Sequence, residues 1–147
     1  MEKDILDKQC EHWEDTFEEK TDMFGVEASL PAQNAAERFN QEGKQKILEL
    51  GGGQGRDTIF FAKNGFDVYV LDYCESGVEA IKQKAAEMGL SDSIHVQCHD
   101  VREPFPFSDE LFDACYSHML YCMAFTTSEL KFINSEINRL LKPQGLN

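Results

Sequence analysis

The sequence predicts an α/β fold with a doubly wound parallel sheet and a helical cap before it. From residue 44 onward, short apolar runs alternate with stretches of helical periodicity, which is the pattern of a parallel sheet covered by helices. The segment ILELGGGQGRD, residues 47–57, joins a strand to a helix through a glycine turn that leaves backbone open to a ligand. A chain of 147 residues has the size of one domain. We therefore expect a single domain over 1–147, with the cap over 1–43 and the core over 44–147.

The cap is predicted to contain two helices. Four residues share one apolar face of the first helix at helical spacing: Ile5, Leu6, Trp13 and Phe17. A second short helix, AQNAAERF, follows Pro31, a residue that favours the first turn of a helix. The residues between them, 22–30, are expected to form a loop.

Four strands are expected in the core, each a short apolar run bounded by turn residues or a helix. They lie at residues 46–50, 67–71, 94–98 and 111–117. Three helices alternate with them, and the first covers about 55–63. Ser76 with Glu79 forms a capping-box pattern at the start of the second helix. Thr126 with Glu129 forms the same pattern at the start of the third, which ends before the proline of the final LKPQGL.

Acidic residues dominate the composition. There are 27 Asp and Glu against 14 Lys and Arg, so the formal net charge is −13. Nucleic-acid binders neutralise phosphates with basic clusters, and this chain has no run of Lys or Arg. We therefore expect no nucleic-acid partner and no membrane partner. The charged N-terminus has no apolar segment typical of a signal peptide, so we expect a cytoplasmic protein.

The cysteines and histidines show no metal-binding pattern. The five cysteines are an odd number without a CxxC pair, which favours reduced, packed thiols over a disulfide framework or a zinc ribbon. No three ligands have metal spacing, so no metal is predicted.

The spacing of the glycines distinguishes between classes of cofactor. A dinucleotide fingerprint, GxGxxG, that starts at Gly51 would need a third glycine where Arg56 stands, and no GK[ST] follows to make a P-loop. The sequence instead reads (D/E)xGxGxG from Glu49 to Gly55. With the acidic residues that end the next two strands, this pattern resembles the class I S-adenosylmethionine-dependent methyltransferases. A glycine turn without a ligand and a nucleotide-dependent oxidoreductase are the alternatives.

The resemblance implies S-adenosylmethionine as cofactor and a Rossmann-like core. The residues that it assigns to cofactor binding are Glu49, Gly51, Gly52, Gly53, Gly55, Asp72, Tyr73, Asp100, Val101 and Ser117. Asp72 closes the second strand, where a carboxylate accepts hydrogen bonds from both ribose hydroxyls, and Tyr73 would lie beside the adenine. Asp100 would accept a hydrogen bond from the adenine amino group, next to the backbone amide of Val101.

Two further expectations concern the acceptor side of the site. His118, after the fourth strand, is a candidate general base. The alternative roles are a hydrogen-bond donor that orients the acceptor and a structural histidine. The cap segments HWEDTF and MFGVEASLPA resemble the leader of small-molecule methyltransferases of the tellurite and thiopurine type. That likeness implies that Trp13, Phe17 and Phe24 exclude water around the sulfonium. The alternative is that the same aromatics dock the helix on the sheet.

The resemblance also implies a function and a sheet that is shorter than that of the full family domain. It implies methyl transfer to a small-molecule acceptor, since the NPPY and DPPY motifs of methylation at planar nitrogens are absent. The full family domain continues through strands five to seven, so we expect a sheet of order 3-2-1-4, truncated before strand five. A free edge on strand four predicts a homodimer. The alternative function is a non-catalytic S-adenosylmethionine-binding half-domain that dimerises through this edge.

Overall fold

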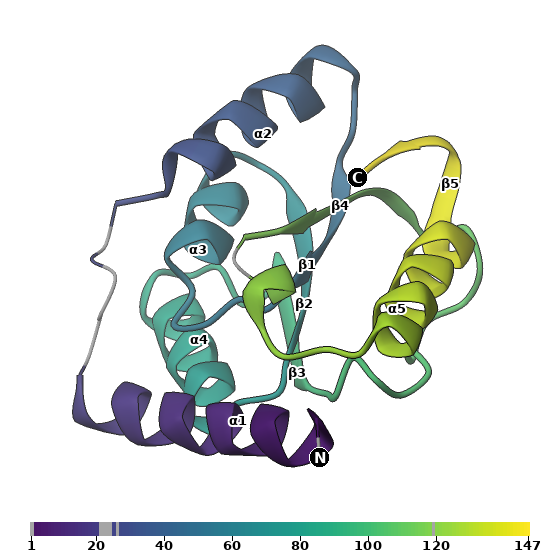
Figure 1. Cartoon of the computed structure of the whole chain (residues 1–147). Coiled ribbons are helices and arrows are strands. Elements are labelled where there is room, and N and C mark those ends of the chain that lie inside the picture. Colours follow the sequence, from purple (N-terminus) through teal and green to yellow (C-terminus); the bar gives the residue numbers. More distant parts are fainter. Residues whose placement is uncertain (1, 21–24, 26, 119) are drawn as a thin grey trace.

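The computed structural model describes residues 2–20, 25, 27–118 and 120–147, which form one parallel sheet with helices around it (Figure 1). The strands are β1 (Lys46–Leu50), β2 (Asp67–Asp72), β3 (Ile94–Cys98), β4 (Phe112–Ser117) and β5 (Leu141–Leu146). The helices are α1 (Glu2–Glu19), α2 (Leu30–Gln41), α3 (Arg56–Lys63), α4 (Glu75–Glu87) and α5 (Thr127–Leu140), with a short 3-10 helix, η1 (Leu120–Cys122). The spatial order of the strands is β3-β2-β1-β4-β5.

The prediction of a sheet truncated before strand five is wrong. The final segment LKPQGL forms β5, which pairs in parallel with β4, so β4 is covered on both sides. The pairing is irregular, because Phe112 faces Leu141 whereas Ala114 faces Leu146. Pro143 lies in the intervening bulge, where a missing backbone N–H costs no regular ladder bond. The proline and glycine of this segment therefore indicated a turn, although the chain is a strand.

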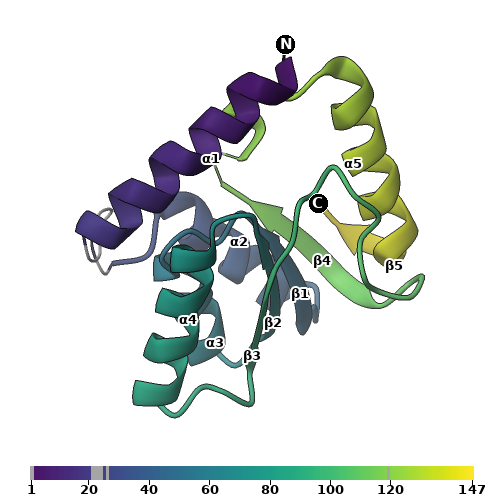
Figure 2. The ribbon, with the colours of Figure 1, turned by 90° about the horizontal axis from the view of Figure 1, so that it is seen from below.

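Helices cover both faces of the sheet, as a doubly wound fold requires (Figure 2). On one face, α2, α3 and α4 contribute Phe39, Phe61 and Ile81 to a buried cluster. On the other face, α5 contributes Ile133 and Ile137 to a second cluster. The α/β class and the parallel, doubly wound arrangement are thus confirmed.

One of the two predicted capping boxes is present. At the start of α5, the Glu129 backbone N–H donates to Thr126 Oγ1 and the Thr126 N–H donates to the Glu129 carboxylate, both at 3.0 Å. The box predicted at the start of α4 is wrong, because that helix begins at Glu75 after Cys74, with no side-chain cap. The Ser76 hydroxyl donates instead to the Glu14 carboxylate of α1, at 2.7 Å. A tertiary partner has replaced the local one.

The two cap helices lie at opposite ends of the core (Figure 1). Pro31 occupies the first turn of α2, as predicted, and α2 packs on α3 with Ala32 and Phe39 buried. α1 crosses the N-terminal end of α4, beside the carboxyl ends of the strands. Only α1 therefore covers the edge of the sheet where parallel α/β folds bind ligands. Within the described ranges, no helix combines the length and apolar character needed to cross a membrane.

Candidate functional site

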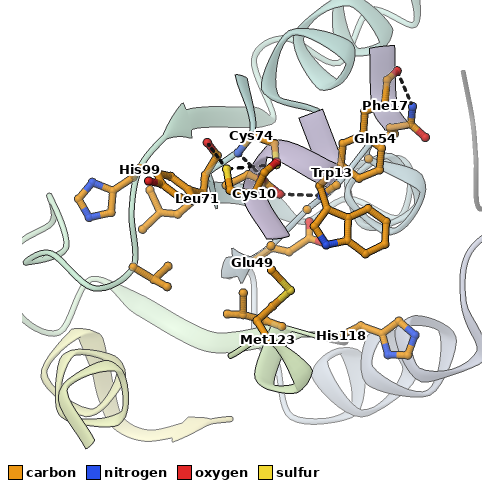
Figure 3. A pocket seen from close by; sticks show the side chains of 18 of the residues that line it. Cys10, Trp13, Phe17, Glu49, Gln54, Leu71, Cys74, His99, His118 and Met123 are labelled. Atoms are coloured by element: carbon orange, nitrogen blue, oxygen red, sulfur yellow. Dashed lines mark hydrogen bonds between the residues drawn. The ribbon is translucent and has the colours of Figure 1, made fainter. Parts of the chain in front are cut away.

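A pocket opens at the carboxyl ends of the strands, between the glycine loop and α1 (Figure 3). The structure places most of the residues singled out in the sequence around it: Glu49, Gly51, Gly52, Gly53, Gly55, Asp72, Tyr73, Asp100, Val101 and His118. Ser117 ends β4 but does not line the pocket. Residues far apart in the sequence thus meet at one site, because parallel strands end at a common edge.

The glycine loop has a backbone that other residues would strain. Gly51, Gly53 and Gly55 have φ angles of 75°, 57° and 91°, in the left-handed region. Gly52 has an ordinary φ but no room, since a Cβ there would lie 2.6 Å from Val70 Cγ1. The loop therefore passes close over β2 and presents its main chain to the pocket.

A fifth glycine, which the sequence reading missed, lies against this loop. A Cβ on Gly77, in the first turn of α4, would stand 2.6 Å from the carbonyl oxygen of Gly53. Helix α4 therefore packs directly on the loop. A glycine inside an otherwise helical segment is itself a signal of close backbone approach, because glycine disfavours the helix.

Asp72 connects the loop to the end of β2. Its Oδ2 accepts a hydrogen bond from the Gly53 N–H and its Oδ1 accepts one from the Cys74 N–H, both at 2.8 Å. Burial raises the pKa of Asp72 to about 6 in spite of these two bonds. Each carboxylate oxygen has a second lone pair, so the group retains capacity for ligand hydroxyls.

Glu49 lies in the middle of the pocket wall (Figure 3). Its side chain is buried and accepts a hydrogen bond from the Thr58 hydroxyl. Burial raises the pKa of Glu49 to about 8, since a charged carboxylate is poorly solvated there. A cationic ligand group beside it would favour the charged form.

Asp100 is fully engaged by Arg102, a residue that the sequence reading did not single out. Asp100 Oδ1 accepts from the backbone N–H and Nε of Arg102, and Oδ2 accepts from Nε and Nη2, at 2.7–3.0 Å. Burial raises the pKa of Asp100, but the hydrogen bonds from Arg102 outweigh it and hold that pKa below the usual value. Arg102 also lies over the Tyr73 ring, 5.5 Å from its centroid.

Helix α1 forms the remaining wall. Trp13 and Phe17 line the pocket with their ring centroids 5.5 Å apart. Gln54 in the glycine loop holds the end of this helix, because its Nε2 donates to the Lys20 carbonyl at 2.7 Å and to the Phe17 carbonyl at 3.4 Å. Gln54 was not predicted from the sequence. Phe24, expected to join these aromatics, lies outside the described residues.

The side of the pocket formed by residues that follow β4 is mostly apolar. His118 follows β4 and lines the pocket, and Met119 lies outside the described residues. Beyond it, Leu120, Met123 and Phe125 form an apolar wall. His118 thus places an imidazole on the pocket wall at the end of β4.

A buried polar cluster fixes α2 beside the pocket. The Asp57 carboxylate accepts from the Ser29 backbone N–H and hydroxyl, both at 2.8 Å, and from the Tyr116 hydroxyl at 3.0 Å. These bonds join α2, α3 and β4, and all three residues are buried. Within the described part of the chain, no group of three or more His, Cys, Asp or Glu side chains is arranged to hold a metal ion.

The chain matches the model of a known protein family. A model of the methyltransferase domain matches residues 47–145. The uncharacterized methyltransferase YodH of Bacillus subtilis is 27% identical over 134 residues, covering 87% of this chain and 54% of that protein. The chain thus spans about half the length of this curated relative.

Other relatives differ in the acceptors that their names state. The ubiquinone/menaquinone biosynthesis C-methyltransferase UbiE of Vibrio parahaemolyticus is 32% identical, over 69% of this chain and 39% of that protein. A tRNA 5-carboxymethoxyuridine methyltransferase of Escherichia coli is 34% identical, over 40% of this chain and 23% of that protein. The crystal structure of a putative S-adenosyl-L-methionine-dependent methyltransferase from Methanococcus maripaludis superposes with a TM-score of 0.73 and 22% identity, covering 92% of this chain and 60% of that one.

Proposed function

The chain belongs to the methyltransferase domain family, and on this premise we propose that it transfers a methyl group from S-adenosylmethionine to a small-molecule acceptor. The observation that carries the proposal is the hydrogen bond from the Gly53 N–H to Asp72 Oδ2, at 2.8 Å. It places a carboxylate and the main chain of the glycine loop on one wall of the pocket. The residues present fit this cofactor, because the Asp72 carboxylate, the Glu49 carboxylate and the main chain of the glycine loop line the same pocket.

The pocket offers a distinct group to each part of the cofactor. Asp72 would accept hydrogen bonds from the ribose hydroxyls, and Tyr73 would lie against the adenine. Asp100 would accept a hydrogen bond from the adenine amino group once one of the Arg102 hydrogen bonds to Oδ2 breaks. The glycine loop and Glu49 would hold the methionine end, where the ammonium and sulfonium favour an ionised carboxylate. Ser117 does not line the pocket, so it would contribute only indirectly, as the last residue of β4.

The cofactor, when bound, supplies an already activated sulfonium methyl group. The protein then has to align an acceptor with that carbon and exclude water. Trp13 and Phe17 cover the pocket from α1 and would exclude water. His118 would take the proton of a protonated acceptor or orient it by a hydrogen bond.

A small-molecule acceptor is supported by charge and by the pocket wall. The net charge of −13 opposes a polyanionic substrate, and the wall beyond His118 is apolar. The homodimer and the cytoplasmic location remain predictions. The alternative half-domain was expected to pair through a free β4 edge, but β5 covers that edge, so a dimer formed through the sheet would use β3 or β5.

The decisive test has two stages. Calorimetry of the purified chain should detect binding of S-adenosylmethionine and S-adenosylhomocysteine, and Asp72→Asn should weaken both. Transfer of a labelled methyl group is then assayed with thiols, chalcogen oxyanions, small amines, quinols and bulk tRNA. Transfer to tRNA alone would refute the small-molecule acceptor, and the absence of cofactor binding by the folded chain would refute the function.

A further inference from the structure

Two thiols from distant parts of the chain meet at the wall of the pocket. Cys10 on α1 and Cys74 at the start of α4 have their Sγ atoms 3.9 Å apart, and both residues line the pocket (Figure 3). Cys74 is buried and Cys10 is partly exposed. The Cys74 thiol also donates to the Cys10 carbonyl at 3.8 Å, so the two residues face each other closely.

This pair lies at one of the contacts that attach α1 to the core. α1 carries Leu6, Trp13 and Phe17 into the pocket, so the helix must move if a large ligand is to enter or leave on this side. Its other described attachments near the pocket are non-covalent, such as the Ser76 hydroxyl donating to Glu14 at 2.7 Å. A covalent bond at Cys10 would change how easily the helix opens.

We propose that Cys10 and Cys74 form a reversible disulfide that locks α1 over the pocket. A disulfide needs an S–S separation of about 2.05 Å. The thiols therefore have to approach by roughly 2 Å from their present 3.9 Å, which is within reach of side-chain rotation and a small shift of the helix. The proposal adds a modification site to the pocket and does not use either thiol in methyl transfer.

The oxidation balances with hydrogen peroxide as the oxidant. The more accessible Cys10 thiol attacks the peroxide, so that its sulfur becomes a sulfenic acid and one water is released. The Cys74 sulfur then displaces hydroxide from that sulfur, forming the S–S bond, and its proton leaves with the hydroxide as a second water. Two electrons pass from the two sulfurs to the peroxide. Burial together with Glu14, Asp72 and Cys98 raises the pKa of Cys10, so we expect this reaction to be slow at neutral pH.

The first experiment detects the bond and does not depend on the proposed function. Wild-type protein, incubated with hydrogen peroxide and then digested, should yield a Cys10–Cys74 cross-linked peptide, with a loss of two hydrogens in the intact mass. Cys10→Ser and Cys74→Ser should abolish it. Cys98→Ser is the matched control and should keep it, because the Cys98 thiol is exposed and takes no part in the contact between Cys10 Sγ and Cys74 Sγ. A cross-link to Cys98, or no cross-link, would overturn the proposal.

The second experiment measures the lock and rests on the proposed cofactor. The rate at which labelled S-adenosylhomocysteine leaves the oxidised protein should fall by about tenfold or more, because the cross-link removes open arrangements of α1. A thiol reductant should restore the rate, and oxidised Cys10→Ser should release ligand at the reduced wild-type rate. Unchanged release from cross-linked protein would refute the lock. Absence of binding in either state, with the cross-link present, would refute the cofactor and leave the disulfide intact.

Discussion

Arg102 Nη2 donates to Asp7 of α1 at 2.9 Å and also to Asp100, beside the pocket, at 2.7 Å. One guanidinium thus links the helix that covers the site to the carboxylate proposed for adenine recognition. Its Nη1 is buried without a hydrogen-bond partner in the described part of the chain. Because the Asp100 oxygens already accept two bonds each, the proposed adenine binding would compete with the attachment of α1 for the same carboxylate.

Replacing Arg102 with Gln should therefore sharpen the selectivity for adenine. The freed Asp100 would accept a hydrogen bond from the amino group, which S-inosylhomocysteine lacks. We expect the affinity ratio of S-adenosylhomocysteine to this analogue to rise about fivefold, as one hydrogen bond of about 1 kcal/mol predicts. Calorimetry with both ligands measures it. Asp7→Asn, which leaves the Asp100 pair in place, is the control and should not change the ratio; an equal ratio in Arg102→Gln contradicts the competition.

Asp72→Asn should weaken cofactor binding by about 10- to 100-fold, the range expected when a carboxylate that accepts hydrogen bonds becomes a neutral amide. The amide also presents a donor to the Gly53 N–H, which is itself a donor, and so disturbs the loop. Isothermal calorimetry gives the affinity. Asp67→Asn, at the opposite end of β2, is matched in chemistry and should bind normally. Equal losses in both variants would show a general effect of removing charge.

Stability should depend on pH through Glu49. Burial raises the pKa of Glu49 from 4.5 to about 8, so the folded chain holds a proton that the unfolded chain has released. The stabilising contribution is complete below pH 4.5 and is lost as the pH rises to about 8. The raised pKa of Asp72 contributes stability with the same sign, and that contribution is lost as the pH rises to about 6. Urea unfolding between about pH 6.5 and 8.5 should show a loss on the order of 2 kcal/mol in wild type. Glu49→Gln should flatten that slope; a slope that persists would refute the assignment.

Gly77→Ala should destabilise the protein and weaken cofactor binding together. Alanine normally favours a helix over glycine by about 0.5–1 kcal/mol, so the sign expected from helix propensity alone is stabilising. Here the new methyl group would stand 2.6 Å from the Gly53 carbonyl and push the loop away. Thermal unfolding and calorimetry report the two effects. Lys82→Ala, on an exposed part of the same helix, should leave both unchanged.

Gln54→Ala should loosen α1 while leaving the sheet intact. The variant removes the donor that holds the Phe17 and Lys20 carbonyls at the end of the helix. Hydrogen exchange in α1 should accelerate about fivefold, consistent with the loss of about 1 kcal/mol of local stability. Exchange in β1 and β2 should not change. Gln45→Ala, an exposed glutamine before β1, serves as the comparison; faster exchange throughout the molecule would instead indicate global destabilisation.

The core elements were predictable because their signals are local. β1 and β3 lie where their apolar runs predict, and β2 and β4 differ from prediction by one residue at one end. The same reasoning failed where a distant partner decided the outcome. Ser76 matches a capping box but bonds to Glu14, 62 residues away. β5 was missed because its proline and glycine lie in a bulge that exists only opposite β4.

The residues around the pocket also divide into those with a local sequence signal and those decided by distant partners. The glycine loop and Asp72 follow from short motifs, whereas the partners that complete the site come from afar. Arg102 meets Asp7 across 95 residues and Gln54 meets Lys20 across 34, and no spacing in the sequence specifies these pairs. Gly77 carried a signal, since a helix seldom tolerates glycine without a packing reason.

The position of α1 has a consequence for the order of folding. α1 precedes the sheet in the sequence, but some of its contacts are with segments far along the chain. The Ala124 N–H, for example, donates to Gln9 Oε1 at 3.0 Å, across 115 residues. Contacts of such high sequence separation form late, because loop closure is entropically costly. The sheet should therefore assemble before α1 docks, so that a transient species has a formed sheet and a detached α1. Kinetic refolding monitored at Trp13 should show a slow final phase.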